Sequence, residues 1–245
     1  MSHSNLILAY HGCDITVRDD LIARRTHLKT SINVYDWLGP GIYFYEADPD
    51  RALEHARTVH DHPELLLATS AIATPAVIGV VLQVSRWLDM STHAALQEFG
   101  EAAETSYQGY LAKDEPIPQN EPAYQGDEDN LRRPFDNASF TTLHGLREKA
   151  YAKSISEQRY ADASELRPYQ AVRSAFSQGK KIAGQSEFKT KNHTQIALRD
   201  GSCIKGYFIP VGHPPMQDGT SREASLKLLE QAKDHRKRLK PRRRA

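Results

Sequence analysis

The chain has 245 residues, of which 39% are hydrophobic and 26% charged, with a formal net charge of +1. This composition is ordinary for a globular protein long enough to bury a sizeable core. Two cysteines, Cys13 and Cys203, exclude a disulfide framework and favour a reducing compartment. The N-terminus has no basic segment before its short apolar run, and no stretch approaches about 18 apolar residues. We therefore expect no signal peptide, no membrane span and a cytoplasmic location.

The charge is concentrated at the C-terminus. Residues 233–245 carry eight Lys/Arg and one Asp, whereas the other 232 residues carry 24 basic and 30 acidic side chains. One interpretation is a solvated, frayed end that aids solubility. The other is a tail that binds phosphate groups or an acidic partner.

The first elements in the chain alternate between strand and helix. The apolar run at 5–12 predicts a buried strand closed by a glycine. A short helix follows over 14–26, with Asp14 or Thr16 as its N-cap. The stretch "NVYDWLGPGIYFYE" at 33–46 then places the breaker Gly-Pro-Gly directly before an aromatic strand.

The next two elements are a helix and a central strand. The helix over 47–61 has Asp48 as a cap and Pro49 at its first position, where the missing N–H is harmless. The most continuous β-branched run of the chain predicts a strand over 76–84. Helical composition and apolar spacing predict a further helix over 92–113.

The middle of the chain contains a loop and a helical region. Residues 114–129 hold three prolines and six acidic residues without a basic one, so we predict an acidic loop or insertion over 114–136. Residues 139–175 are expected to be mostly helical, with an interruption near Pro168.

The C-terminal part predicts a hairpin and a helix. Residues 193–210 are typical of two strands joined at Asp-Gly. A helix is expected over 221–240, capped by Ser221. Strands at both ends with helices between them favour the α+β class. We expect one catalytic domain over 1–215 and a helix with a basic tail over 216–245.

Common catalytic motifs are missing from the sequence. It has no dinucleotide-binding glycine motif, phosphate-binding loop or serine nucleophile elbow. Three neighbouring histidines, His55, His60 and His62, lack metal-ligand spacing, so no metal is expected. His11 ends an apolar strand, and Gly12 after it would let a ligand approach the backbone. On this feature alone, His11 is better interpreted as a buried histidine whose hydrogen bonds are made within the protein than as a residue that binds a ligand.

Three segments taken together suggest a family. "YHG" at 10–12, "GPGIYF" at 39–44 and "HTQIAL" at 193–198 resemble the three-part signature of ADP-ribosyltransferases of the diphtheria-toxin and poly(ADP-ribose) polymerase type, in particular a bacterial toxin-like branch. The resemblance covers roughly 5–90 and 165–212. It implies a split β-sandwich with flanking helices and NAD as the substrate, without a metal.

The resemblance also implies roles for individual residues. His11 would bind the adenosine-side ribose, Gly12 would offer its backbone to the nicotinamide carboxamide, and Tyr43 would stack on the nicotinamide ring. Gln195 stands where the family usually has a catalytic glutamate. His193 is two residues earlier on the same strand face and would orient or deprotonate the acceptor.

The segment that leads into the aromatic strand would border the cofactor. Ser31 and Asn33 lie on this segment, and Gly41 belongs to the tight turn that would admit the cofactor to the backbone. Phe44 should point into the core, whereas Tyr35 and Trp37 should brace the turn.

The sequence departs from the family pattern in two places. Gln195 carries no charge and is no base, so we expect single-unit transfer and no polymer synthesis; Glu187, eight residues earlier, is an alternative carboxylate. The second stacking tyrosine is missing, and His55, the nearest ring, is best explained as a helix-surface residue. Cys13, after His-Gly, is interpreted as a small buried residue.

These features predict a mono-ADP-ribosyltransferase. Cleavage of the nicotinamide bond creates an oxocarbenium-like ribose, which aromatic and hydrogen-bonding groups can hold and stabilise. The expected acceptor is a macromolecule, RNA favoured over protein because of the basic tail. A toxin of a toxin–antitoxin or phage-defence system, with a neutralising partner, fits this shape. The alternatives are an NAD glycohydrolase and a catalytically silent module that binds NAD or ADP-ribose.

Overall fold

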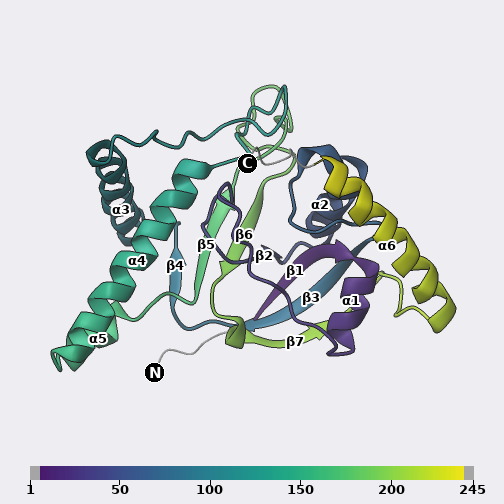
Figure 1. The fold of residues 1–245 in the computed structure, drawn as a ribbon, viewed down its shortest axis with the longest axis horizontal. Helices are drawn as coiled ribbons and strands as arrows, with labels where there is room; N and C mark the ends of the chain where they lie inside the picture. The colour runs from purple at the N-terminus through teal and green to yellow at the C-terminus, as the bar shows by residue number, and fades with distance from the viewer. Residues whose placement is uncertain (1–5, 240–245) are drawn as a thin grey trace. The chain divides into compact units, whose positions relative to one another are not determined.

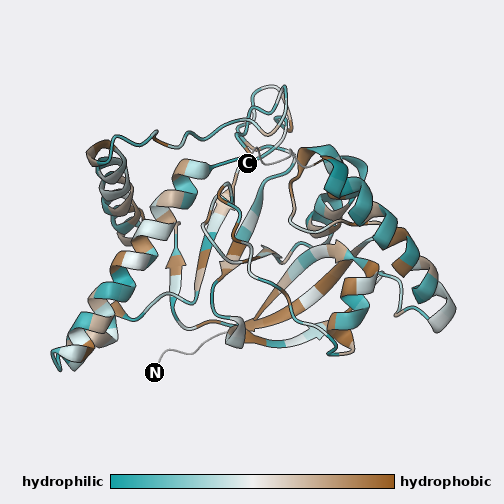
Figure 2. Ribbon diagram, viewed as in Figure 1, coloured by the Kyte–Doolittle hydropathy of each residue, from teal (hydrophilic) through white to brown (hydrophobic). Residues whose placement is uncertain are grey.

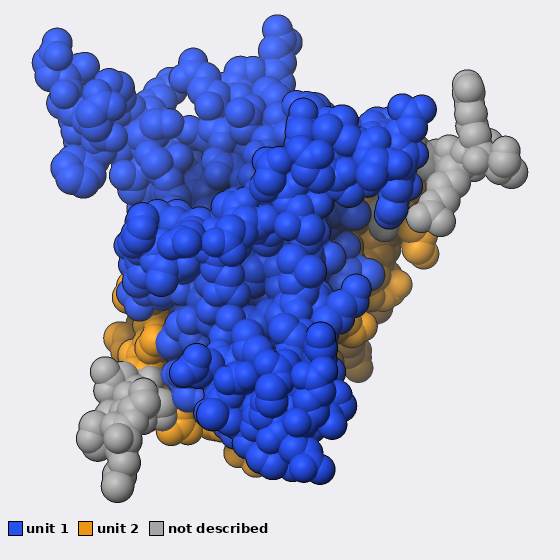
Figure 3. All heavy atoms as spheres, turned by 90° about the vertical axis from the view of Figure 1, so that its left-hand side faces the viewer, with its two compact units in different colours: residues 1–5, 30–43, 84–203 blue, residues 6–29, 44–83, 204–245 orange. Residues whose placement is uncertain are grey.

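The computed structural model describes residues 6–239, which form two compact units. The first unit contains residues 30–43 and 84–203, and the second contains the other described residues (Figure 3). The chain combines helices and strands, compatible with the predicted α+β class (Figure 1). Between residues 6 and 239, none of the helices combines the length and the apolar character that a bilayer crossing requires.

The first unit contains a small mixed sheet with helices. Strand β5 pairs in parallel with β4 and antiparallel with β6. Helices α3 and α4 pack together, with the Phe99 and Phe140 rings 4.5 Å apart. The bounds are β4 Trp87–Asp89, α3 His93–Ala112, α4 Pro134–Ser156, α5 Tyr160–Leu166, β5 Ala171–Phe176 and β6 His193–Leu198.

The second unit is built on a run of antiparallel strands. The strand order is β2-β1-β3-β7, with β1 between β2 and β3. Helix α2 packs on β1 and β3, whereas α1 packs on β3 and β7. The bounds are β1 Leu6–Asp14, α1 Ile15–Ile22, β2 Ile42–Glu46, α2 Pro49–Asp61, β3 Pro75–Gln83, β7 Ile204–Phe208 and α6 Gly219–Leu239. The first two residues of β2 belong to the first unit.

Hydrophobic burial explains the central strand of the second unit. β3 has the sequence PAVIGVVLQ, and its residues Val77, Ile78, Val80 and Leu82 are fully buried. Figure 2 shows β1 and β3 largely hydrophobic, whereas α6 is mostly hydrophilic. β-branched side chains favour a strand because they pack well on a pleated surface.

Most predicted elements of the N-terminal half are confirmed. Asp14 caps α1, accepting hydrogen bonds from Thr16 and, through its other oxygen, from the amides of Ala73 and Thr74. Asp48 caps α2, with Pro49 in its first turn. Cys13 is buried, as predicted, and forms no disulfide; burial raises the pKa of its thiol to about 12.

Three predictions for the C-terminal half are wrong. Residues 171–175, expected to be helical, lie in β5. β6 and β7 form no hairpin, because β6 pairs with β5 and β7 pairs with β3, with a 3₁₀ turn at Gly201–Cys203 after β6. Ser221 is not the cap of α6: the helix already begins at Gly219, and the Asp218 carboxylate accepts a hydrogen bond from the Ser221 amide at 2.7 Å.

The acidic segment between α3 and α4 is an organised loop. It has no helix or strand before α4, which begins at Pro134 and so includes the last three residues of the predicted 114–136 loop. The Asp127 carboxylate accepts hydrogen bonds from the amides of Ala123, Asp129 and Leu131. The Asp129 carboxylate binds the Gly179 amide and Lys189 Nζ, at 2.8 and 2.6 Å. The buried Asp127 therefore organises the loop itself, and Asp129 holds it against residues 177–191 of the same unit.

The segment that precedes the C-terminal helix α6 is joined to α1 through a buried arginine. Arg18 is fully buried and forms an ion pair with Asp19 at 2.8 Å. Its guanidinium also donates to the carbonyls of Pro214 and Pro215, at 2.8 and 2.9 Å. Of the basic tail, residues 233–239 are helical, and the remaining predicted tail lies outside the described residues.

Candidate functional site

The segment that leads into β2 forms a closed turn in the first unit. Ser31 and Gly41 exchange two backbone hydrogen bonds, at 2.8 and 3.1 Å. Asn33 Nδ2 donates to Ser31 Oγ at 2.9 Å. The Asn137 amide on α4 donates to the carbonyls of Asn33 and Asp36, at 3.1 and 2.9 Å. The predicted residues Ser31, Asn33 and Gly41 therefore belong to one structure, the 31–41 turn.

Two glycines let the 31–41 turn pack closely against its neighbours. Gly39 has φ +77°, and a Cβ there would lie 2.8 Å from Phe140 Cβ. A Cβ on Gly41 would lie 3.0 Å from the Ala197 backbone in β6. Contacts closer than about van der Waals distance must be relieved by a shift of the backbone. Packing within the protein thus requires both glycines, and the approach of the cofactor to the Gly41 backbone stays a prediction.

Tyr43 is fixed to the same turn by its hydroxyl group. Tyr43 Oη donates to the Gly39 carbonyl at 2.8 Å and accepts from the Leu38 amide at 3.0 Å. Burial raises the pKa of this hydroxyl well above its ordinary value, so it stays protonated. Tyr43 as a whole is half-buried, and Phe44 beside it is fully buried, as the strand alternation predicted.

Gln195 is joined to the 31–41 turn by Trp37. The indole Nε1–H of Trp37 donates to Gln195 Oε1 at 2.5 Å. Trp37 was expected only to brace the turn. The structure gives it a direct contact with the residue at the glutamate position. The turn therefore holds both Tyr43, through its backbone, and Gln195, through an indole.

Aromatic rings and a cation surround this contact. Phe176 lies 4.7 Å from Trp37 and 5.6 Å from His193, ring to ring. The Arg133 guanidinium lies over Phe176 at 4.5 Å and over Trp37 at 5.5 Å. Both distances are within the range of favourable cation–π contacts. Gln195 and His193 lie on one strand, and both are next to this cluster.

His193 has a defined tautomer when its ring is neutral. Its Nδ1 lies 2.7 Å from the Lys191 carbonyl, which can only accept, so Nδ1 carries the proton. The basic nitrogen is therefore Nε2, and that atom is buried. Glu187 is an unsuitable substitute for the missing carboxylate, because it is 87% exposed and paired with Lys181 at 2.6 Å.

Sequence reasoning missed one carboxyl group of the 31–41 turn. Burial raises the pKa of Asp36 to about 6, although hydrogen bonds from Ser31 and Asn33 oppose this shift. Its Oδ2 is buried, and no described residue donates to it. The sequence does show an acidic residue between two aromatic residues, in "YDW". The burial of its carboxyl group, however, depends on tertiary packing.

His11 and Gly12 belong to the second unit. The His11 ring is partly exposed and meets the Phe44 ring edge-on at 6.0 Å. Gly12 is buried, and a Cβ there would lie 2.2 Å from the Ala52 carbonyl oxygen in α2. Gly12 is therefore required for the close contact between β1 and α2. Its proposed contact with nicotinamide is additional to this structural role.

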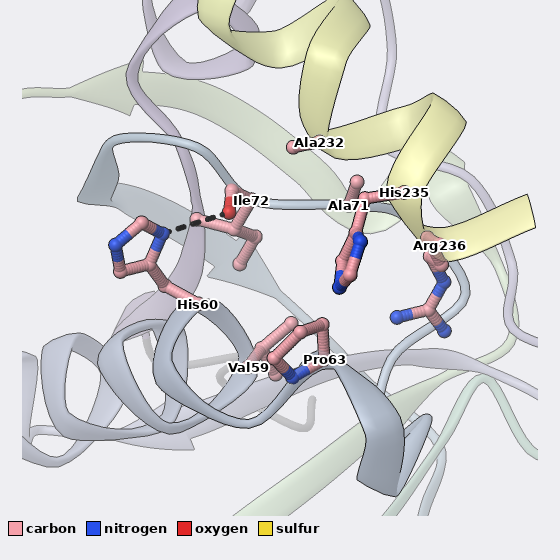
Figure 4. A pocket seen from close by; sticks show the side chains of 8 residues that line it. All are labelled: Val59, His60, Pro63, Ala71, Ile72, Ala232, His235 and Arg236. Atoms are coloured by element: carbon pink, nitrogen blue, oxygen red, sulfur yellow. Dashed lines mark hydrogen bonds between the residues drawn. The ribbon is translucent and has the colours of Figure 1, made fainter. Parts of the chain in front are cut away.

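The second unit also has a small pocket of about 110 Å³ (Figure 4). His60 Nδ1 donates to the Ile72 carbonyl at 3.1 Å at its edge. The lining is mainly apolar, with Val59, Pro63, Ala71, Ile72 and Ala232 beside His60, His235 and Arg236. None of the predicted site residues lines it.

Residues 6–239 contain no group of three His, Cys, Asp or Glu side chains placed to hold a metal ion. Comparison of the chain with protein families, with curated proteins and with solved structures finds no match. The site must therefore be interpreted from its own geometry.

Proposed function

We propose that the chain is a mono-ADP-ribosyltransferase that uses NAD as its substrate. The bond between C1′ of the ribose and the nicotinamide nitrogen breaks, and its electron pair leaves on the nicotinamide ring. C1′ then bonds to a nucleophilic atom of the acceptor, which gives up its proton. The family fold that this reaction implies, a split β-sandwich of the ADP-ribosyltransferase type, is part of the proposal.

One observation carries the proposal. The 31–41 turn binds both Tyr43 and Gln195, two residues that are 152 positions apart in the sequence and that the family resemblance selects independently. A tyrosine ring suits the flat nicotinamide, and a neighbouring amide suits the ribose hydroxyls. Both groups are held rigidly, which favours catalysis because less order must be created in the transition state.

The remaining roles follow from the resemblance. His11 would bind the adenosine-side ribose, with Gly12 contributing backbone to the nicotinamide carboxamide. His193 would serve the acceptor side, and the hydrogen bond between its Nδ1 and the Lys191 carbonyl fixes the orientation of its ring.

The acceptor is proposed to be RNA in preference to protein, within a toxin that acts in the cytoplasm and is neutralised by a partner. The supporting feature is the basic C-terminal segment 233–245, which carries eight Lys/Arg and one Asp; Lys237 and Arg238 are exposed in the last turn of α6, whereas Arg236 is buried. Clustered cations attract the phosphates of nucleic acids, and this attraction weakens with salt.

Incubation with adenylate-labelled NAD tests the function. We expect free nicotinamide and label in the RNA fraction, with Tyr43→Ala as the inactive control. Tyr151→Ala, a tyrosine on α4 outside the turn, is the matched variant that should retain activity. Release of free ADP-ribose without labelled acceptor would identify a glycohydrolase, and no turnover would indicate a silent binding module. Either result would contradict the proposal.

A further inference from the structure

Trp37 determines which end of the Gln195 amide is available to a ligand. An indole N–H can only donate, whereas a glutamine amide has an accepting oxygen and a donating NH₂ group. The atom 2.5 Å from Trp37 Nε1 must therefore be Gln195 Oε1, whichever way the amide is otherwise assigned. The NH₂ group then points away from the indole.

The surroundings of Gln195 leave this NH₂ group available. Gln195 is partly exposed on β6, opposite Ser174 in the register with β5. Within residues 6–239, no side chain or carbonyl accepts a hydrogen bond from Gln195 Nε2. The outward-facing part of Gln195 is thus a hydrogen-bond donor.

Trp37 is itself held in place. Its ring meets Phe176 edge-on at 4.7 Å, and the Arg133 guanidinium covers both rings. Arg133 in turn donates to the carbonyls of Asn130 and Asp129, both at 3.1 Å. The indole cannot turn away from Gln195 without disturbing this stack, so the orientation of the amide is built into the fold.

We propose, on the basis of the function proposed above, that Trp37 is a positioning residue that makes Gln195 donate to a ribose hydroxyl oxygen of NAD. Because the amide oxygen accepts the hydrogen bond from the indole, it is not directed at the cation that develops at C1′. Gln195 therefore holds the sugar and does not stabilise the charge. The indole N–H would hold the oxygen of a carboxylate equally well, so the same position can accept a glutamate.

The first test reads the hydrogen bond directly, without any catalytic assay. The chain has two tryptophans, and Trp37→Phe assigns their indole ¹H–¹⁵N signals. Gln195→Met removes the accepting oxygen at similar volume. We expect the Trp37 signal to shift upfield and to exchange faster with solvent in this variant, while the Trp87 signal stays unchanged. An unchanged Trp37 signal would overturn the inference, even if the enzyme proved active.

The second test is a double-mutant cycle on nicotinamide release. Trp37→Phe keeps the ring but loses the N–H, so kcat/KM for NAD should fall about tenfold, the effect of one ordinary hydrogen bond. In the Gln195→Met background the same change should have no further effect, because the interaction is already lost. Trp87→Phe is the control and should leave kcat/KM unchanged. Additive effects of the two substitutions would overturn the positioning role.

The two tests separate the inference from the function on which it rests. If the wild-type protein releases no nicotinamide, the proposed function fails, and the indole signal still decides whether Trp37 orients Gln195. If nicotinamide is released but the substitutions are additive, the function stands and the inference is wrong.

Discussion

The stability of the first unit should depend on pH through one buried histidine. His144 on α4 is 4% exposed and stacks on Phe140, with ring centroids 6.4 Å apart. Neither ring nitrogen forms a hydrogen bond within the described residues. Burial, together with the smaller effect of the facing cations Arg199 and Arg147, lowers the pKa of His144 to about 3. The folded protein therefore accommodates only the neutral ring.

The direction and size of the effect follow from proton linkage. The pKa of His144 is about 6.5 in the unfolded chain and about 3 in the folded protein, so between these pH values only the unfolded chain binds the proton. The contribution of His144 to stability is therefore complete above pH 6.5 and is lost as the pH falls. Between pH 7 and pH 4.5, this one group should cost about 3 kcal/mol of unfolding free energy. Asp36 acts in the opposite direction, because its raised pKa favours the folded state on acidification.

A comparison of variants isolates the contribution of His144 to the pH dependence of stability. His144→Phe keeps the stack on Phe140 and removes the titrating group, and His144→Leu serves if phenylalanine is not tolerated. Urea unfolding at pH 7 and pH 4.5 can be followed by tryptophan fluorescence, since Trp37 and Trp87 both lie in the first unit. The wild type should lose about 3 kcal/mol more than the variant between these pH values. Equal losses, matching those of the exposed control His27→Phe, would refute the reasoning.

Three further outcomes follow from the structure. Gln195→Glu should raise the rate of nicotinamide release about tenfold, because the carboxylate both stabilises the ribose cation and binds the indole N–H; a rate at or below wild type would count against this. Arg18→Met should lower the unfolding free energy by about 3–5 kcal/mol in urea titrations, because Asp19 is left charged and buried. The double variant Arg18→Met with Asp19→Asn should recover part of this loss. Gly12→Ala should lower the melting temperature through its collision with α2, whereas Gly100→Ala, in the open middle of α3, should raise stability by about 1 kcal/mol; the opposite ranking would contradict the packing at Gly12.

Local signals in the sequence were sufficient for several elements. The caps at Asp14 and Asp48 work through bonds to residues a few positions away, which a sequence pattern can show. The central strand at β3 follows from a β-branched run that must be buried. Helix α3 follows from composition and apolar spacing alone.

Other elements depended on partners far away in the chain. β5 has the sequence AVRSAF, whose short length and mixed composition fit a helix equally well, and its pairing with β4 and β6 decides the outcome. The Asp-Gly at 200–201 predicted a hairpin, but a turn signal cannot specify which strands pair when a third strand competes.

The candidate site divides in the same way. The sequence by itself determined the residue types that the chemistry needs, the tyrosine after a tight turn and the glutamine two positions after a histidine, because these are properties of short segments. Only the tertiary structure joined Trp37 to Gln195 across 158 positions and buried the Asp36 carboxyl. Hydrogen bonds and desolvation depend on which groups the fold places side by side, and no local pattern records that.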